Sequence, residues 1–106
     1  MRASKVFYKE EFAGILTQND DGSFHFEYNE NWISDESKPS ISLTLPKNEI
    51  EFSSEFLFPF FYHLLPEGAN KRIVCKTYKI EEDDVFGILL HTSKYDTIGA
   101  ITLQRI

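Results

Sequence analysis

The hydrophobic period of this chain changes halfway along it, from two residues to the spacing of an α-helix. In the first half, alternate residues of one stretch are aromatic, at Phe24, Phe26 and Tyr28. This alternation places the three rings on one face of a β-strand. In the second half, apolar residues recur at helical spacing, at Phe60, Phe61, Leu64 and Leu65. Strands followed by helices predict an α+β fold, a small antiparallel sheet with about three helices packed on one face.

Turn sequences divide the first half of the chain into hairpins. Lys9 and Glu10 separate two apolar stretches, residues 6–8 and residues 12–16. Residues 19–22 end in Asp-Gly, a pair that readily adopts the positive φ of a tight hairpin turn. We therefore expect a series of short antiparallel strands.

The polar segment after these hairpins contains one more predicted strand. Residues 29–39 include Trp32 and are expected to form a loop or a short helix over the sheet. A half-buried strand is predicted next, because apolar and polar residues alternate again, with the apolar ones at Ile41, Leu43 and Leu45. Residues 47–52 are expected to be a connection or a short edge strand.

Two helices are predicted between residues 59 and 78. Pro59 fits the first turn of the first helix, where its missing N–H removes no hydrogen bond. Pro66 either ends this helix or opens the next. The second helix, from residue 67 to about residue 78, is expected to turn four residues toward the core, namely Ala69, Ile73, Val74 and Tyr78.

A third helix and a last strand complete the predicted order. Asp83 or Asp84 is expected to cap the third helix. Its inward residues are predicted to be Phe86, Leu89 and Leu90. A turn at residues 96–99 then leads to a strand that returns to the sheet, with Ile101 and Leu103 facing the core.

Composition limits the partners and compartments open to this chain. Its 106 residues suffice for one domain, placed at residues 1–106. Direct binding to DNA or RNA is not expected, because the formal net charge is -6 and such binding needs clustered Lys and Arg. The single cysteine, Cys75, excludes an internal disulfide and is expected to be a small buried side chain. No signal-peptide core or membrane-spanning run is present, so we expect a cytoplasmic protein.

The sequence contains no strong catalytic or cofactor-binding motif. Its glycines form no phosphate-binding loop, and it has no kinase catalytic loop or Asp-Phe-Gly motif. No spacing typical of a metal site is present either. We therefore expect no cofactor, no metal and no enzymatic activity. His25 and Glu27 share one strand face and form a weak candidate for a base and its orienting group, although a solvated strand face is the commoner origin of such a pair.

The chain has more aromatic residues than a small core easily hides: ten Phe, five Tyr and one Trp. Most are expected to be buried, and for any one residue burial is the commoner outcome. The sharper hypothesis is that Trp32, Phe56 and Phe58 form an exposed patch that docks on a partner, because exposed aromatic clusters in soluble domains usually mark interfaces.

Short motifs follow one another along the chain in a recognisable order. They are Phe-Ala-Gly-Ile-Leu at 12–16, the aromatic alternation at 24–28, Ser-Ile-Ser-Leu-Thr-Leu-Pro at 40–46, Phe-Phe-Tyr-His-Leu-Leu-Pro-Glu-Gly at 60–68, Phe-x-x-Leu-Leu at 86–90 and Asp-x-x-Gly-Ala-Ile-Thr-Leu at 96–103. This series resembles the N-terminal subdomain of the HipA-type toxin kinases over most of the chain. The resemblance implies the fold of that subdomain.

A free-standing version of this subdomain is similar to the HipS-type antitoxins of three-component, HipBST-type toxin–antitoxin systems. The resemblance implies an antitoxin that binds a separate HipT-like Ser/Thr kinase toxin and blocks its activity. A HipB-like DNA-binding protein would complete the complex. We predict the contacts with the partner at six residues, namely Trp32, Phe56, Phe58, Phe60, His63 and Glu67.

Two other classes of function stay open at this stage. The domain can be a structural subunit that supports a kinase without inhibiting it. It can also be a small enzyme or ligand-binding domain that uses His25 and Glu27. The start at Met1 and the end at Ile106 are expected to mark a natural short reading frame rather than a fragment of a full HipA-type kinase.

Overall fold

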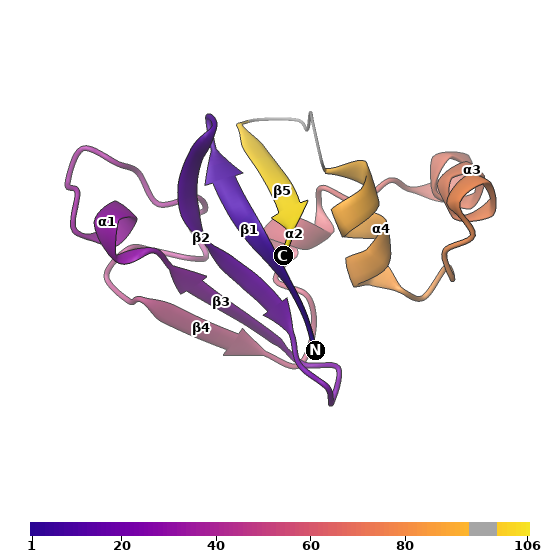
Figure 1. Ribbon diagram of the computed structural model, residues 1–106, viewed down its shortest axis with the longest axis horizontal. Coiled ribbons are helices and arrows are strands. Elements are labelled where there is room, and N and C mark those ends of the chain that lie inside the picture. The colour runs from indigo at the N-terminus through magenta and orange to yellow at the C-terminus, as the bar shows by residue number, and fades with distance from the viewer. Residues whose placement is uncertain (94–99) are drawn as a thin grey trace.

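A five-stranded antiparallel sheet with helices packed on one face makes up the computed structural model, which describes residues 1–93 and 100–106 (Figure 1). The strands lie in the order β4-β3-β2-β1-β5. Their bounds are β1 Arg2–Tyr8, β2 Glu11–Gln18, β3 Phe24–Tyr28, β4 Glu51–Ser54 and β5 Ile101–Arg105. The helices in the described ranges are α1 Glu30–Ile33, α2 Pro59–Tyr62, α3 Gly68–Tyr78 and α4 Val85–Thr92. The predicted α+β fold class is confirmed.

Both predicted hairpin turns are confirmed. Lys9 and Glu10 join β1 to β2 with φ angles of 49° and 70°, the left-handed values that a tight two-residue hairpin turn requires. Gly22 has a φ of 89° in the second turn, a conformation that glycine adopts without steric cost. The N–H of Asn19 donates to the carbonyl of Ser23 at 2.8 Å and closes this turn. Local turn chemistry therefore sets the register next to each turn, and the pairing of β1 with β2 shifts once, between Val6 and Phe7.

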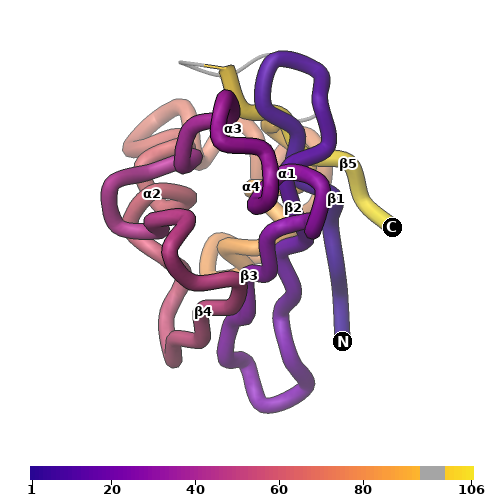
Figure 2. The backbone as a smooth tube through the Cα atoms, turned by 90° about the vertical axis from the view of Figure 1, so that its left-hand side faces the viewer, coloured from indigo at the N-terminus to yellow at the C-terminus, as the bar shows by residue number. Residues whose placement is uncertain are grey.

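The inner face of the sheet is filled by aromatic rings. Phe26 is fully buried, with its ring centroid 4.9 Å from that of Tyr28 and 5.8 Å from that of Phe61 in α2. Gly14 on the neighbouring strand leaves room for these rings, since a Cβ there would lie 2.8 Å from the Phe26 ring and 2.4 Å from the backbone oxygen of Glu27. Helices α2 and α4 lie on the same side of β1 and β2 (Figure 2).

The strand predicted through Ile41, Leu43 and Leu45 is wrong, because the chain makes a turn there. The N–H of Leu45 donates to the carbonyl of Ser42 at 3.1 Å, and Leu43 is 98% exposed at the turn. The Tyr28 hydroxyl accepts the N–H of Ile41 at 3.1 Å and donates to the carbonyl of Leu45. Burial raises the pKa of this hydroxyl, which keeps it protonated as a donor. These bonds satisfy backbone groups that a neighbouring strand would otherwise bind.

The segment from α2 to Pro66 follows the prediction closely. Pro59 stands in the first turn of α2. Helical turns continue past the end of α2, with the N–H of Leu65 donating to the carbonyl of Tyr62 at 3.1 Å. Phe61 is fully buried, and Leu64 and Leu65 pack against the core from the same segment.

Helix α4 and strand β5 are also confirmed, and the four residues of α4 that are buried include the three predicted ones: Phe86, Ile88, Leu89 and Leu90. Ile101 and Leu103 of β5 face the core and are 3% and 1% exposed. The turn predicted at residues 96–99 lies outside the described residues.

Asp84 joins the first strand to α4. Its side chain caps the helix by accepting the N–H of Gly87 at 3.1 Å. It also accepts two hydrogen bonds from Arg2, at 3.1 and 2.6 Å, and the Arg2 guanidinium lies 5.2 Å from the centroid of the Phe86 ring. The hydrogen bonds from Arg2 hold the pKa of the Asp84 carboxyl below its ordinary value.

Replacing Asp84 tests this junction. Asp84→Ala removes both the cap and the ion pair and should lower the free energy of unfolding by about 2 kcal/mol. Asp84→Asn keeps an oxygen for the Gly87 N–H and should lower it by less. Urea denaturation measures both changes. Equal losses in the two variants would contradict a separate contribution of the cap, and no loss in Asp84→Asn would contradict a contribution of the charge.

The same pair predicts an acid dependence. Because the pKa of Asp84 is lowered in the folded protein, its contribution to stability is present in full above the pKa of an unfolded aspartate, about 4. The contribution is lost as the pH falls through the lower, folded pKa. Asp84→Asn should therefore show a smaller loss of unfolding free energy below about pH 4 than the original chain.

Candidate functional site

The exposed patch predicted from Trp32, Phe56 and Phe58 is only partly present. Trp32 is 3% and Phe58 7% exposed, so their predicted exposure is wrong. The Trp32 ring packs 5.6 Å from the ring of Tyr8, and its Nε1–H donates to the carbonyl of Pro39 at 2.9 Å. Both aromatic residues belong to the core because α1 and the start of α2 lie directly on the sheet.

Phe56 is the one member of that predicted patch that reaches solvent. It lies between β4 and α2, is 77% exposed, and donates its backbone N–H to the Ser54 hydroxyl at 3.2 Å. Of the other three predicted contact residues, Phe60 is half-buried beside Phe61, with ring centroids 5.2 Å apart, and the remaining two, His63 and Glu67, are exposed. The structure therefore leaves exposed one aromatic and two polar residues of the predicted set.

Helix α3 turns most of its apolar residues toward solvent, which overturns the inward face predicted for it. Ile73 is 61% and Tyr78 53% exposed, Ala69 is exposed as well, and Val74 is half-buried. Cys75 is the buried residue of this helix, as expected for that side chain. The helix lies beyond α4 and away from the sheet (Figure 1), so the core does not reach its outer side.

In the part of the chain that the structure describes, few contacts join α3 to other elements. The ring of Tyr78 packs at a tilt against that of His91 in α4, with centroids 3.8 Å apart and an interplanar angle of 43°. Lys79 ends the helix in the left-handed conformation, with a φ of 57°, and the N–H of Ile80 returns to the carbonyl of Cys75 at 2.9 Å. The ring contact between Tyr78 and His91 therefore joins the last turn of α3 to α4.

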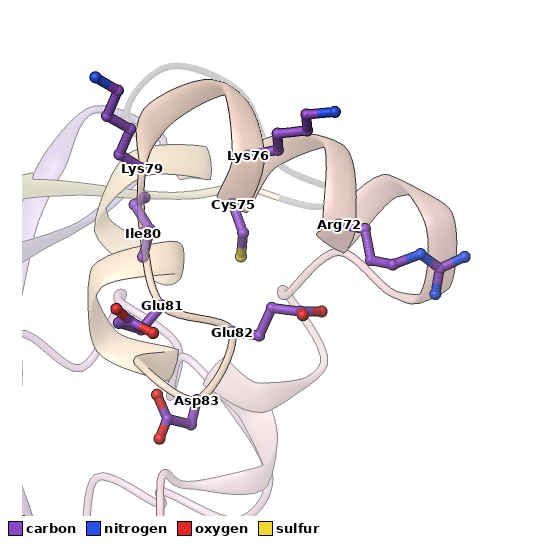
Figure 3. Close-up of a pocket in the computed structure, with 8 residues that line it drawn as sticks. All are labelled: Arg72, Cys75, Lys76, Lys79, Ile80, Glu81, Glu82 and Asp83. Atoms are coloured by element: carbon purple, nitrogen blue, oxygen red, sulfur yellow. The ribbon is translucent and has the colours of Figure 1, made fainter.

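An open cleft of about 640 Å³ lies between α3 and the segment that leads to α4 (Figure 3). Cys75 and Ile80 supply its apolar atoms. Basic side chains line it from α3 and acidic ones from the following segment, namely Arg72, Lys76, Lys79, Glu81, Glu82 and Asp83. None of these charged groups forms an ion pair with another of the six, so both signs of charge stay available to a partner.

A second, smaller cleft of about 250 Å³ connects three helices. Its walls come from the end of α2, the start of α3 and the first turns of α4, with apolar atoms from Leu65, Val85 and Ile88. Glu67 and Lys71 stand at this cleft and add one charge of each sign. An apolar cleft with a charged rim can bind a protruding apolar side chain of a partner.

The predicted His25–Glu27 pair has a third member that the sequence did not reveal. The Nε2 atom of His25 lies 3.9 Å from Oε1 of Glu27 and 3.6 Å from Oε1 of Glu51. Glu51 comes from β4, and its position beside Glu27 depends on the pairing of β3 with β4. Glu51 could have been predicted as the third member only from the correct pairing register of β4 with β3.

Comparison with known proteins agrees with this architecture. Residues 4–104 match the family model described as the HipA N-terminal domain. A solved structure titled "N-terminal domain of HipA toxin" superposes with a TM-score of 0.71 and 31% identity, covering 100% of this chain and 93% of that one. The fold is thus the α+β fold of a HipA N-terminal domain. The chain belongs to the HipA N-terminal domain family.

Relatives of two different lengths share this domain. An uncharacterized protein of Haemophilus influenzae is 36% identical over 105 residues, which cover 99% of this chain and 93% of the relative. "Putative kinase Y4mE" of Sinorhizobium fredii is 30% identical over 97% of this chain, and "Putative kinase Y4dM" of the same organism is 32% identical over 87% of it. The chain spans only 24% of each of the two rhizobial proteins.

In the two described ranges, no helix combines the length and the apolar character needed to cross a bilayer.

Substitutions on α3 test how loosely the helix is held. Tyr78→Ala removes the ring contact with His91 and should speed amide exchange across α3, while exchange in β1 and β2 stays unchanged. Ile73→Ala is the matched control, because that side chain is exposed and its loss should change the unfolding free energy by about 0.5 kcal/mol or less. Hydrogen exchange followed by mass spectrometry measures both. Unchanged exchange in the Tyr78 variant would contradict this account of the attachment of α3.

Proposed function

We propose that this protein is a HipS-type antitoxin, which binds a separate HipT-like Ser/Thr kinase toxin and inhibits it. A HipB-like DNA-binding protein completes the proposed complex. The proposal places the protein in the cytoplasm with its partners. In physical terms, a domain that longer relatives carry within one chain is supplied here as a separate subunit.

The observation that carries the proposal is the exposure of apolar side chains along α3. In the two rhizobial relatives the corresponding domain makes up 24% of a longer chain. The rest of that longer chain can pack against exposed apolar side chains of the domain. Here Ile73 and Tyr78 are more than half exposed, at 61% and 53%. Apolar side chains gathered on one helix favour a protein partner over a small molecule.

The clefts beside α3 add to this support. One has apolar walls and a charged rim, and the other has basic and acidic side chains that are not paired with one another. Such surfaces fit a protein partner that supplies protruding apolar side chains and charges of both signs. They are poorly suited to a nucleic acid, since the net charge of the chain is -6.

Charge also favours a kinase as the partner. A kinase cleft that handles phosphate groups carries positive charge, and a subunit with a net charge of -6 is drawn to it. This attraction raises the association rate and weakens as salt is added.

Within this proposal the six predicted residues have different roles in binding the kinase. Phe56 is the proposed plug of the kinase cleft, because it is the most exposed aromatic residue of the six, at 77%. Phe60, His63 and Glu67 are proposed to contact the kinase beside it. Trp32 and Phe58 are buried and act only by holding α1 and the start of α2 in place.

Phe56→Ala tests inhibition. The kinase that co-purifies with the tagged chain from its own cells should autophosphorylate more slowly when the chain is added. Phe56→Ala should weaken this inhibition about tenfold or more, with an unchanged melting temperature, because the side chain makes no core contact to lose. Leu43→Ala is the matched control, since Leu43 is equally apolar and 98% exposed but lies outside the α2–α3 region.

The assay separates inhibition from scaffolding. Undiminished inhibition by the Phe56 variant, or an equal loss in the Leu43 variant, would overturn the proposed contact. A kinase that binds the chain and keeps or gains activity would replace the antitoxin with a structural subunit.

A further inference from the structure

The face of the sheet opposite the helices contains a cluster of three side chains that the proposed function does not use. His25 and Glu27 belong to β3, and Glu51 belongs to β4. One ligand-type atom from each residue lies within 4.8 Å of those of the other two. The nearest approaches are 3.6 Å, between Nε2 of His25 and Oε1 of Glu51, and 3.9 Å, between the same nitrogen and Oε1 of Glu27.

Strand pairing fixes the backbone positions of this cluster. In the antiparallel register of β3 and β4, Glu27 stands directly opposite Glu51, and His25 stands opposite Ser53. Two carboxylates opposite each other on neighbouring strands repel and destabilise the pairing. Both are more than half exposed, at 51% and 59%, so a cation from solvent can reach them. A cation bound between them would remove this repulsion.

A hydrogen bond holds the His25 ring in a suitable orientation. Its Nδ1 atom lies 3.3 Å from the hydroxyl oxygen of Ser53. Nδ1–H can donate to this oxygen, which leaves Nε2 with a free lone pair on the side of the two carboxylates. An imidazole that binds a metal through one nitrogen usually donates a hydrogen bond from the other. Ser53 is therefore a positioning residue for the ring.

We propose that His25, Glu27 and Glu51 form a surface site for a divalent transition-metal ion, with Zn²⁺ as the ion of choice. Zinc takes imidazole nitrogen and carboxylate oxygen at about 2.0 to 2.1 Å in tetrahedral geometry, which puts neighbouring ligand atoms about 3.3 Å apart. The observed separations are 3.6 and 3.9 Å from the histidine nitrogen, and the three ligand atoms all lie within 4.8 Å of one another, so side-chain rotations must bring them closer to reach that value. A water molecule supplies the fourth ligand. Imidazole makes Ca²⁺ and Mg²⁺ poorer candidates, since both prefer oxygen ligands throughout.

The site joins the edge strand to the rest of the sheet. Strand β4 pairs with β3 and is the last strand on that side. A metal ion held by Glu51 on β4 and by two residues on β3 crosslinks the two strands. The site exists only in the folded chain, because the unfolded chain does not hold the three side chains together. Binding of the ion should therefore raise the melting temperature, and the rise should grow with the zinc concentration.

Zinc titration of the untagged full chain tests the proposal. Isothermal titration with ZnCl₂ should give one saturable site per chain, and the melting temperature should rise with zinc. Co²⁺, used as a second probe, should give the visible absorption of a tetrahedral complex. His25→Ala and the isosteric Glu51→Gln should each weaken zinc binding about tenfold or more, as loss of a ligand requires. Circular dichroism confirms that each variant is folded, and Glu51→Gln decides the matter if the histidine variant is not.

Matched controls exclude two other side chains that can bind zinc. His63→Ala and Cys75→Ser should bind zinc as the original chain does, because both residues lie outside the cluster. Binding that is absent in the original chain, unchanged in both cluster variants, or lost in either control would overturn the proposal. The zinc titration uses no kinase, so its outcome tests the metal site independently of the proposed antitoxin function.

Discussion

The packing of Phe61 against Phe26 is the contact on which the rest of the structure depends. Phe26 lies on the inner face of β3, beside the central strand β2, and the Phe61 ring of α2 packs on it with ring centroids 5.8 Å apart. Both rings are fully buried, and Gly14 leaves room for the Phe26 ring. This contact fixes α2 on the sheet, and α3 begins a few residues after α2, just past Pro66. Helix α3 then lies beyond α4 and away from the sheet (Figure 1).

Local signals predicted much of this fold because they act within a few residues. The turns at Lys9 and Gly22, the proline that starts α2 and the aspartate that caps α4 each need only near neighbours in the chain. Alternation predicted the inner face of β3 for the same reason. Motif order along the chain indicated the family, which comparison with known proteins confirmed over residues 4–104.

Features that depend on tertiary contacts were missed. Apolar spacing gave α3 an inward face, yet helical spacing alone does not tell whether a core lies beside it. Leu43 alternates like a strand residue, but the Tyr28 hydroxyl binds the backbone of its segment and the chain turns back. Exposure was overestimated for Trp32 and Phe58 because their burial depends on how α1 and α2 lie on the sheet. The placement of Glu51 beside His25 required the register of the edge strand.

In the proposed function, the surface around α3 binds a kinase. This binding is tested by hydrogen exchange of the chain alone and of the chain in complex with the kinase that co-purifies with it. Helix α3 has few contacts, so its amides should exchange quickly in the free chain. In the complex the account predicts exchange about tenfold slower or more across Gly68–Tyr78, with little change on the outer face of β3 and β4. Protection confined to that outer face, or unchanged exchange in α3 within a stable complex, would contradict the account.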